Sequence, residues 1–590
     1  MQIFLNKYLT NLKFKLFLSL IFSIVFAMLS LFSTLIFSFV IDYVISGNVK
    51  ETFILKIIKA FINGPSILRN KLFLVSIMII VIELFCLIAI YLRDYLKSVV
   101  AENMAMKIRN DFFVHISRLE YQSISKIKTG DLIQRATTDI EMIHDFFNNQ
   151  IQEIVYAVFN SLIAIGILFT INIKMSLISF IGIVIIFFYS YKFNIKIQQQ
   201  FLKSDEAEGA MGDFVSEALG GERIIKAYNM EKYEINKFDR LNKKYHDITK
   251  VCIYYLGNYW SFSYCLILAI NLLIILVGLI EAKNNNISIG NLFVFMAYQM
   301  YMLFPIRNLG KILSDAGKMS VSINRLNEIF NLPIEDYYSG QKFSFNREIE
   351  FKDVSFTYDH HQKILDNLSF KLEKGKKLAI FGKVGSGKST IAYLLNGLLK
   401  ADEGQILIDD IDIKNINISE LRTNISLVLQ EPFLFSKTIK ENVMIAGDET
   451  NIEHMHKVLE TVMMARTINE FKNAHDTLIG EKGITLSGGQ KQRLAISRNL
   501  LTNPKIVIFD DSFNALDNKT EISIRNNLAK INDLTTIIIT QRINIAKECD
   551  QIMVIEDGKI SAFGSHDELI KQDGLYRNIY HLQSQVVKDV

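Results

Sequence analysis

The 590-residue chain has few of the residues that interrupt helices or cross-link domains. It contains 5 prolines, which permits long helices because proline breaks a helix interior. Its four cysteines, Cys86, Cys252, Cys265 and Cys549, match no metal or redox spacing. The first three stand in or beside apolar segments, so we expect buried small hydrophobic groups there and no disulfide.

A large net charge and a cleavable leader are also missing. The formal net charge is +4, which is too small for this length to indicate nucleic acid as a partner. The first apolar run, Leu16–Ile41, is longer than a signal-peptide core and no small-residue cleavage site follows it. We therefore expect a helix that stays in the membrane.

Long apolar runs are what the chain does have, mostly within its first 320 residues. A helix needs about 20 apolar residues to cross the hydrocarbon core of a membrane. Six runs of this kind are a better match to spanning helices than to the buried core helices of a soluble protein. They are Leu16–Ile41, Leu72–Tyr91, Ile151–Ile171, Met175–Tyr191, Tyr254–Ile280 and Leu292–Leu313.

Polar segments with helical periodicity separate some of these runs, and a different composition begins after Pro333. We expect an all-α membrane domain of six spans over 1–333, with long helical extensions into the cytosol. A polar linker over 334–348 leads to the strand-like IEFKDVSFTY. The remainder, 349–590, has the composition of a soluble α/β domain.

The segment LAIFGKVGSGKSTIAYLL is an apolar strand, a glycine-rich turn and a helix, the context that gives a phosphate-loop motif its mechanism. The backbone of the turn surrounds phosphate oxygens, Lys388 supplies positive charge, and Ser389 ligates magnesium. The α/β domain is therefore predicted to be a P-loop ATPase. The predicted ATP-binding loop comprises Gly382, Lys383, Val384, Gly385, Ser386, Gly387, Lys388, Ser389 and Thr390.

Other positions complete the predicted site. The apolar strand IVIFDD ends in Asp510 and Asp511, and Gln430 lies in LVLQEPFLF. We expect Ser389, Gln430 and Asp510 to hold Mg²⁺, and Gln430 and Asp511 to act on the attacking water. Tyr358 is placed to stack on adenine. Without the other motifs it would be interpreted as a surface aromatic residue.

A second motif, LSGGQ, opens a helix with hydroxyl and backbone donors that suit a γ-phosphate. It comprises Leu486, Ser487, Gly488, Gly489 and Gln490. A short loop, NALD, runs from Asn514 to Asp517.

With these motifs the chain resembles an ATP-binding-cassette exporter half-transporter, in which one six-helix membrane domain is fused to one nucleotide-binding domain. The segments TGDLIQRATTD and GERIIKAYNMEKYEINKF extend the resemblance over nearly the whole chain. In this family two cassettes pair head to tail, so each ATP lies between one chain's phosphate loop and the other chain's LSGGQ. The resemblance implies ATP, Mg²⁺, membrane lipid, a small amphipathic substrate and a second half-transporter.

The chain departs from the family pattern at three positions. Asp511 stands where glutamate is usual, and Asn514 stands where serine is usual. Gln541, the switch residue and the third predicted catalytic residue beside Asp511 and Gln430, stands where histidine is usual. An aspartate is one methylene shorter, and a general base must reach the proton that it takes. These departures resemble the degenerate-site subunit of heterodimeric bacterial multidrug exporters. A homodimer that tolerates them is the alternative.

An ATPase domain in the cytosol and six crossings put both termini on the cytosolic side of the cell membrane. Segment 192–253, rich in Lys and Arg, then lies inside, as the positive-inside rule expects. The basic outer loop 46–71 departs from that rule. Its isoleucines repeat at helical spacing, which fits an interfacial amphipathic helix and a solvated loop helix equally well.

Two charged residues within the spans are candidates for the substrate cavity. Glu83 would attract cationic compounds there or, when protonated, bond to a neighbouring helix. Arg307 would line the cavity or sit at its cytosolic mouth. Multidrug export is the expected function. Lipid or peptide export and an ATP-gated channel are the alternatives. Because no cysteine-protease domain precedes the first span in the sequence, we do not expect an exporter that cleaves a leader from its peptide.

Overall fold

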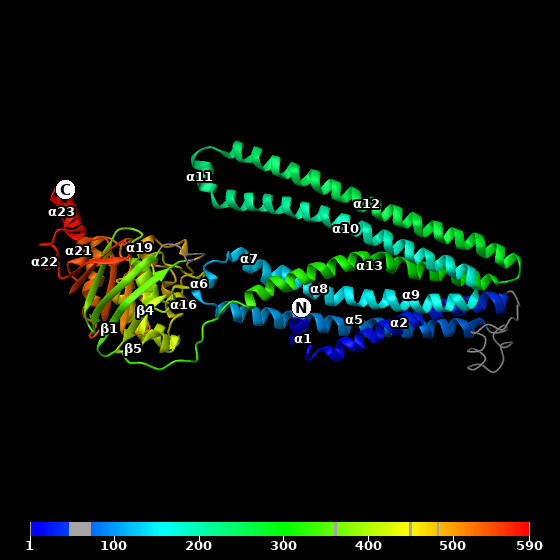
Figure 1. Ribbon diagram of the computed structural model, residues 1–590, viewed down its shortest axis with the longest axis horizontal. Coiled ribbons are helices and arrows are strands. Elements are labelled where there is room, and N and C mark those ends of the chain that lie inside the picture. The colour runs from blue at the N-terminus through cyan, green and yellow to red at the C-terminus, as the bar shows by residue number, and fades with distance from the viewer. Residues whose placement is uncertain (1, 46–71, 359–362, 448–450, 481–482, 589–590) are drawn as a thin grey trace. The chain divides into compact units, whose positions relative to one another are not determined.

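The computed structural model describes residues 2–45, 72–358, 363–447, 451–480 and 483–588 (Figure 1). Contacts within the chain divide it into two compact units. The membrane unit comprises Met1–Ser117 and Ile127–Leu332, and the cassette unit comprises Arg118–Lys126 and Pro333–Val590. The sequence places the border at residue 333 but gives no sign that residues 118–126 belong with the cassette. The predicted outer-loop helix of 46–71 lies outside the described residues.

Six helices of the membrane unit are long and apolar enough to cross a membrane, which confirms the six expected spans. The helices α5, α10, α12 and α13 also extend well beyond their apolar runs, since little proline is present to stop them. The spanning helices are α2 (Lys13–Phe39), α5 (Leu72–Ser117), α9 (Ile151–Ile171), α10 (Ile173–Gly220), α12 (Glu231–Lys283) and α13 (Ile289–Phe330).

Shorter helices complete this unit. Three of them are π-helical, a form that often marks a functional position within a longer helix. The short elements are α1 (Gln2–Leu9), η1 (Val40–Ile45), α7 (Thr129–Gln134), η2 (Arg135–Asp139), α8 (Ile140–Asp145), η3 (Phe146–Gln150) and α11 (Glu222–Ala227). Figure 1 shows α10 and α12 side by side, joined by α11 at the end away from the short α9–α10 turn.

Polar contacts hold together the ends of several spans. The Asp42 carboxylate accepts hydrogen bonds from the Gly290 N–H, at 2.8 Å, and from the Ser288 hydroxyl. Glu281 forms an ion pair with Lys174 at 3.0 Å. Carboxylate at the N-terminus of α13 is favourable because the free N–H groups there carry partial positive charge.

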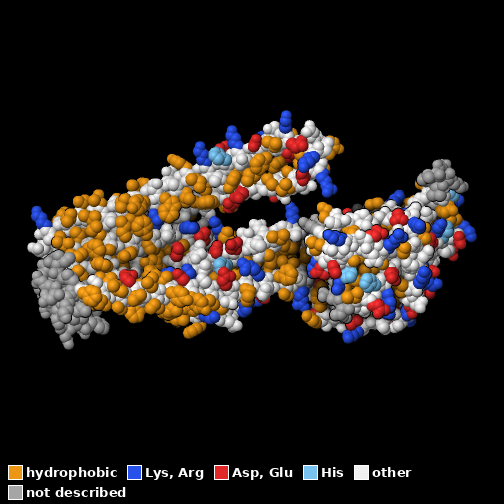
Figure 2. Space-filling model, turned by 180° about the vertical axis from the view of Figure 1, so that it is seen from behind, with side chains coloured by type: hydrophobic (Ala, Val, Ile, Leu, Met, Phe, Trp, Pro, Cys, Tyr) orange, Lys and Arg blue, Asp and Glu red, His pale blue; other side chains and the backbone are white. Residues whose placement is uncertain are grey.

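Apolar side chains cover much of the membrane unit's surface, as Figure 2 shows on one face. Burial within the chain is uneven: 11% of the apolar window of the second span is buried, against 44% for the first. Most of the apolar surface of α5 is therefore left for lipid or another chain to cover.

The expectation for the cysteines is correct at Cys86 and Cys252, which are buried, and wrong at Cys265, which is exposed. In a membrane an apolar surface does not need burial in protein, because lipid solvates it as well as a protein core does. All four cysteines are free.

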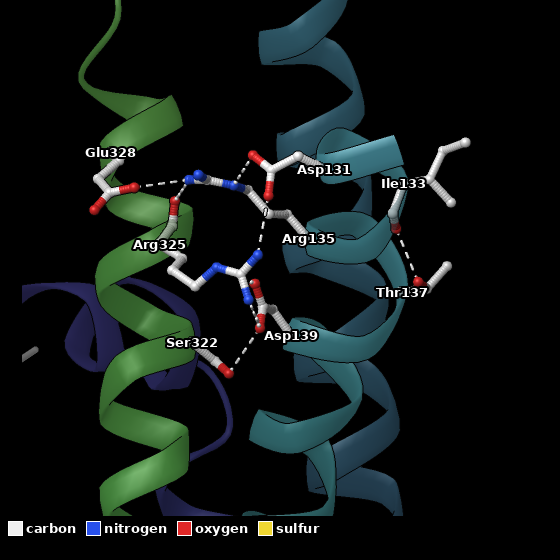
Figure 3. Close-up of polar contacts among 8 residues, drawn as sticks. All are labelled: Asp131, Ile133, Arg135, Thr137, Asp139, Ser322, Arg325 and Glu328. Atoms are coloured by element: carbon white, nitrogen blue, oxygen red, sulfur yellow. Dashed lines mark hydrogen bonds and ion pairs between the residues drawn. The ribbon is translucent and has the colours of Figure 1, made fainter. Parts of the chain in front are cut away.

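A network of charged side chains joins α7 and η2, which precede the third spanning helix, to the end of α13 (Figure 3). Arg325 lies 3.0 Å from the carboxylate of Asp131 and 3.4 Å from that of Asp139. Arg135 lies 2.9 Å from Asp131 and 3.0 Å from Glu328. Ser322 also donates a hydrogen bond to Asp139 at 3.0 Å. Residues of the cassette unit adjoin both partners in the sequence, since 118–126 precede α7 and Pro333 follows α13.

The cassette unit contains two sheets. The antiparallel sheet has the order β2-β1-β4-β5, and the larger sheet has the order β10-β9-β3-β8-β7-β6. Strands β9, β3, β8, β7 and β6 are parallel, and β10 pairs with β9 antiparallel. The strands are β1 (Glu348–Thr357), β2 (Lys363–Glu373), β3 (Lys377–Gly382), β4 (Glu403–Ile408), β5 (Ile411–Asp412), β6 (Ile425–Val428), β7 (Ile506–Asp510), β8 (Thr535–Thr540), β9 (Gln551–Glu556) and β10 (Lys559–Gly564).

Helices cover the larger sheet, whose central strands β7 and β8 are buried along their whole length and are rich in isoleucine. Ala379 and Phe381 point into one hydrophobic cluster, and Leu378 and Ile380 into another. The helices are α6 (Tyr121–Ile124), α14 (Lys388–Leu395), η4 (Ile413–Asn415), α15 (Ile418–Asn424), α16 (Ile439–Met444), α17 (Ile452–Thr461), α18 (Ala465–Asn469), η5 (Ala474–Asp476), α19 (Gly488–Leu500), α20 (Asn518–Leu528), α21 (Ile543–Ala546), α22 (His566–Leu569) and α23 (Leu575–Lys588).

Candidate nucleotide-binding site

The predicted site residues gather because four neighbouring parallel strands end at the same edge of the larger sheet. Phe381 of β3 pairs with Thr540 of β8, and Asp510 of β7 pairs with Ile539 of β8. Val428 of β6 pairs with Phe509 of β7. The phosphate loop, Gln541, the acidic pair and Gln430 each follow one of these strand ends. Ligands of open α/β sheets bind at this edge.

The phosphate loop needs glycine for conformational and steric reasons. Gly385 and Gly387 have φ of +83° and +96°, values that side chains rarely adopt. At Gly382 a Cβ atom would lie 2.4 Å from the Ile555 carbonyl oxygen. Only glycine at these positions therefore allows the loop to turn between β3 and α14.

Lys388 and Ser389 occupy the first turn of α14. The Lys388 ammonium is buried and donates to the carbonyl oxygens of Gly382, at 3.0 Å, and Lys383, at 2.7 Å. Burial lowers the pKa of Lys388, and the nearby carboxylates of Asp511 and Asp510 oppose that shift. Incoming phosphate oxygens would replace carbonyl acceptors with anionic ones, which make stronger hydrogen bonds to an ammonium group.

The Ser389 hydroxyl donates to Asp510 Oδ1 at 3.0 Å. Burial raises the pKa of Asp510, and neighbouring Asp511 raises it further. A hydroxyl and a carboxylate at this separation are two of the hard oxygen ligands that Mg²⁺ prefers.

Three buried oxygens around the loop also fit a polar ligand. Ser386 Oγ, Asp511 Oδ1 and Ser512 Oγ have no hydrogen-bond partner within the described part of the chain. Buried polar atoms are nearly always paired in native proteins, so unpaired ones call for a bound group. The donor set therefore fits both a nucleotide triphosphate and a magnesium ion.

Asp511 directly follows β7 in a left-handed conformation, with φ of +44°. Burial raises the pKa of its carboxyl, and Lys388 and a hydrogen bond from the Asn514 side chain lower it. The three departures from the family pattern thus include two that touch each other, Asp511 and Asn514.

Gln541 and Gln430, two of the predicted catalytic residues, have exposed side chains at the carboxyl ends of β8 and β6. Tyr358, which follows β1, is 39% exposed and meets Phe356 edge-on at 4.8 Å between ring centroids. Its hydroxyl bonds to the Thr390 side chain of the phosphate loop. The exposed part of the Tyr358 ring is available for stacking.

The LSGGQ motif forms a capped helix start. Ser487 Oγ accepts from the Gln490 N–H at 3.3 Å, and Gln490 Oε1 accepts from the Ser487 N–H at 2.9 Å. Leu486 is buried, whereas Ser487 and Gly488 are exposed. The hydroxyl and backbone groups at the start of α19 therefore face outward.

Gly489 connects this motif to the NALD loop. A Cβ atom on Gly489 would lie 3.1 Å from the Ala515 carbonyl oxygen. At the end of the loop Asp517 caps α20 by accepting from the Thr520 N–H at 3.0 Å. A glycine at 489 keeps the two segments in close contact.

Comparison with known proteins agrees with this site. Residues 16–306 match the family model described as ABC transporter transmembrane region, and residues 365–514 match the one described as ABC transporter. The chain is 30% identical to the uncharacterized ABC transporter ATP-binding protein YwjA of Bacillus subtilis, over 84% of this chain and 86% of the relative. The chain belongs to the ABC transporter family.

Other ABC transporters that it resembles have more specific names. It is 29% identical to an ATP-dependent lipid A-core flippase of Desulfotalea psychrophila, over 87% of this chain and 91% of the relative. It is 28% identical to a putative multidrug export ATP-binding/permease protein, YgaD, of Bacillus subtilis, over 87% and 90%.

The fold also matches a solved structure of a bacterial Atm1-family ABC exporter with ATP bound. The TM-score is 0.81 at 22% identity, and the match covers 98% of this chain and 99% of that one. The protein is therefore a multi-pass membrane protein with the exporter fold, an ATP-driven transporter whose cassette binds ATP. Exporters of this fold function as dimers.

Within the membrane unit of this ABC transporter, the two candidate cavity residues differ in surroundings. Glu83 is exposed on α5 and accepts a hydrogen bond from Ser33 of α2 at 2.8 Å. Arg307 is only 6% exposed, and its guanidinium lies 4.2 Å from the Trp260 ring centroid. Arg307 is therefore buried within the membrane unit, against the rings of Trp260 and Phe304.

The sequence analysis missed the part that residues 118–126 play in the cassette unit. Leu119 forms a β-bridge with Ile334, and Glu120 pairs with Lys400 at 2.6 Å. The Tyr121 ring meets Tyr393 of α14 at 5.8 Å. A four-residue helix has no periodicity to detect, so only the tertiary contacts reveal it.

Proposed function

We propose that this chain is one half of a heterodimeric multidrug exporter of the bacterial cytoplasmic membrane. It would move hydrophobic or amphipathic compounds outward by alternating access, and its own ATP site would turn over slowly. Both termini and the cassette would lie in the cytosol.

The observation that carries the slow site is the pairing of Asp511 with Asn514 beside an exposed Gln541. A carboxylate that is one methylene short and hydrogen-bonded to Asn514 is poorly placed to take a proton from water at the γ-phosphate. A misplacement of about 1 Å can cost on the order of a hundredfold in rate. A neutral carboxamide at position 541 supplies no positive charge to the transition state.

The intact LSGGQ motif supports different roles for the two chains of the dimer. Ser487 and Gly488 are exposed at the start of α19, where they would face the phosphate loop of the partner. This chain would thus complete the partner's fast site while its own phosphate loop holds ATP for longer. The partner is expected to keep glutamate and histidine at the positions of Asp511 and Gln541.

The sparse burial of α5 supports a second half-transporter beside this chain, since its apolar side chains need a cover of lipid or protein. Glu83 lies on that helix, and a carboxylate that faces only lipid is costly. A partner or an internal cavity would remove that cost.

Magnesium would be held by Ser389 and Asp510 with Gln430 as the third protein group. When bound, it would neutralise charge on the β- and γ-phosphates. Lys388 and the backbone of the phosphate loop would orient the triphosphate, and Tyr358 would hold the base. Gln430 and Asp511 would position water at the γ-phosphate.

ATP-driven closure of the cassettes would reach the spans through the two chain connections at residues 117–127 and 332–333. The network of Figure 3 ties the helices at these connections together, through Arg325 and Arg135. A movement imposed on one helix would therefore be shared by the other. ATP must bind the closed state better than the open state for such a cycle to run.

For the substrate, we propose amphipathic compounds, cationic ones in particular, with Glu83 as the attracting carboxylate. Lipid export is the second candidate. An aromatic groove of about 560 Å³ between α10 and α12, lined by Tyr189, Phe193 and Phe262, favours it because the groove opens on the apolar surface of the unit. One relative is named as a lipid A-core flippase.

Two measurements test this function. ATP turnover of the purified chain should be negligible alone and should appear when the second half-transporter is added. Full substrate-stimulated turnover by the chain alone would establish the homodimer instead. Lys388→Ala should reduce transport less than the equivalent change in the partner, and equal damage would contradict the asymmetry.

A further inference from the structure

The C-terminal helix α23 packs on the cassette through one face. Tyr576, Ile579, Tyr580 and Gln583 follow one another at the spacing of a single helix face. Tyr576 is buried, and its ring meets Phe381 edge-on at 5.3 Å. Ile579 and Tyr580 pack on the same core. Since Phe381 directly precedes the phosphate loop, α23 rests on the strand that positions this loop.

Gln583 extends the same face to the loop that carries Gln541. Its Nε2 donates to the Gln541 carbonyl oxygen at 2.9 Å, and its Oε1 accepts from the Ile543 N–H at 3.0 Å. Both ends of the carboxamide are therefore used on one short stretch of backbone. These two bonds satisfy backbone groups that have no strand partner after the end of β8.

Arg542, which lies between these two contacts in the sequence, is bonded to α20. Arg542 Nη2 donates to Asn518 Oδ1 at 2.8 Å, and its Nη1 pairs with the carboxylate of Glu521. Asn518 and Glu521 belong to α20, which begins directly after the NALD loop. The switch loop, residues 541–543, is thus fixed between α23 and α20.

We infer that Gln583 is a positioning residue that sets the place of Gln541 over the γ-phosphate of ATP. The inference rests on the proposed function, with Gln541, at the position where histidine is usual, as a residue that would still hydrogen-bond the γ-phosphate. A neutral carboxamide attracts phosphate more weakly than a charged imidazolium, so its effect depends on a short, well-directed hydrogen bond. Hydrogen-bond energy falls steeply with poor alignment, and the backbone of Gln541 is what Gln583 aligns.

A purely structural role for α23 predicts something different. Loss of packing would weaken ATP and ADP binding together, because both nucleotides use Lys388 and the phosphate loop. Loss of a positioned Gln541 would weaken only nucleotides that carry a γ-phosphate. The ratio of the two affinities therefore separates the two roles.

The test measures equilibrium binding of ATPγS and ADP to the full-length chain in lipid nanodiscs. Gln541→Ala should lower the ratio of ATPγS to ADP affinity about tenfold, the effect of one hydrogen bond to a charged group. Gln583→Leu should lower the same ratio at least about threefold, with ADP affinity kept within about twofold. The double variant should be no worse than Gln541→Ala, because both act through one contact.

Two further variants keep the result interpretable. Gln583→Glu keeps the acceptor for the Ile543 N–H but places a carboxylate against the Gln541 carbonyl oxygen. It should therefore lower the affinity ratio as Gln583→Leu does. If Gln583→Leu does not fold, the result for Gln583→Glu tests the positioning role. Leu582→Ala, an exposed position on the same helix, should leave both affinities unchanged.

An unchanged ratio in both Gln583 variants, beside a lowered ratio in Gln541→Ala, would overturn the positioning role and leave the switch role intact. Additive effects in the double variant would overturn it as well. An unchanged ratio in Gln541→Ala would refute the role proposed for Gln541, and this inference with it.

Discussion

Substitutions in the charged network between α7, η2 and α13 test the proposed coupling directly. Arg325→Gln removes the guanidinium that pairs with Asp131 and Asp139 but keeps a polar side chain. Asp139→Asn removes the charge on the other side and keeps an acceptor for Ser322. Each change leaves part of the network without its counter-charge.

The size of the effect follows from burial. The Asp139 side chain is 6% exposed and that of Arg325 is 29% exposed. Removing one partner of a fully buried pair costs about 3–5 kcal/mol, and exposed pairs contribute about 0–1 kcal/mol. A half-solvated arginine places Arg325→Gln between these limits, at about 2 kcal/mol, and we expect the midpoint of thermal unfolding to fall by about 4 °C.

The assay compares thermal unfolding and substrate-stimulated ATP turnover of full-length variants in the same detergent. Glu453→Gln, which breaks the exposed Glu453–Lys457 pair of the cassette, is the control and should change neither. Arg325→Gln should lower the unfolding midpoint and reduce the stimulation by substrate while basal turnover persists. An effect no larger than that of the control would refute the coupling role of this network.

Three other changes test separate parts of the site. Because burial raises the pKa of Asp511, its carboxyl keeps a proton to higher pH than usual; turnover at this chain's own site should therefore fall as pH falls through that raised pKa, and Asp511→Asn should remove this acid limb from the pH–rate profile. Gly489→Val should reduce transporter ATP turnover about a hundredfold, because its side chain meets the Ala515 carbonyl and displaces donors from the partner's ATP; turnover above a tenth of normal would contradict this. Glu83→Gln keeps an acceptor for Ser33 but no charge, so export of a cationic dye should fall several-fold while a neutral amphiphile is exported as before, and equal loss of both would exclude the proposed attraction.

Much of the fold could be predicted because its signals are strong and local. Apolar runs near 20 residues long identify the six spans without any tertiary information. The phosphate loop is identified by glycines whose φ values are positive and by the strand and helix on either side. Parallel pairing then follows, because alternating strands and helices form such sheets.

Other features depend on contacts that no local pattern contains. The exposure of Cys265 could not be predicted, because apolar composition alone does not distinguish the faces of a span. Glu120 and Tyr121 belong to the cassette only through partners such as Lys400 and Tyr393, nearly 300 residues away.

The switch loop illustrates the same limit. Gln541 could be found as a departure from a motif. Gln583 stands 42 residues later in the sequence, in a helix whose amphipathic pattern is ordinary. Its role depends on where α23 docks, which Tyr576 and Phe381 decide through core packing. Sequence identifies the residues that a motif fixes, and tertiary structure identifies the residues that hold them.

The most direct test of the central claim, that Asp511 and Gln541 make this chain's own ATP site slow, is ATP turnover by the assembled transporter with Asp511→Glu and Gln541→His combined. A longer carboxylate and a chargeable imidazole should raise turnover at this site at least about tenfold, and adding Lys388→Ala should abolish the gain. Unchanged turnover in a variant that unfolds at the same temperature as the natural protein would contradict the slow-site account.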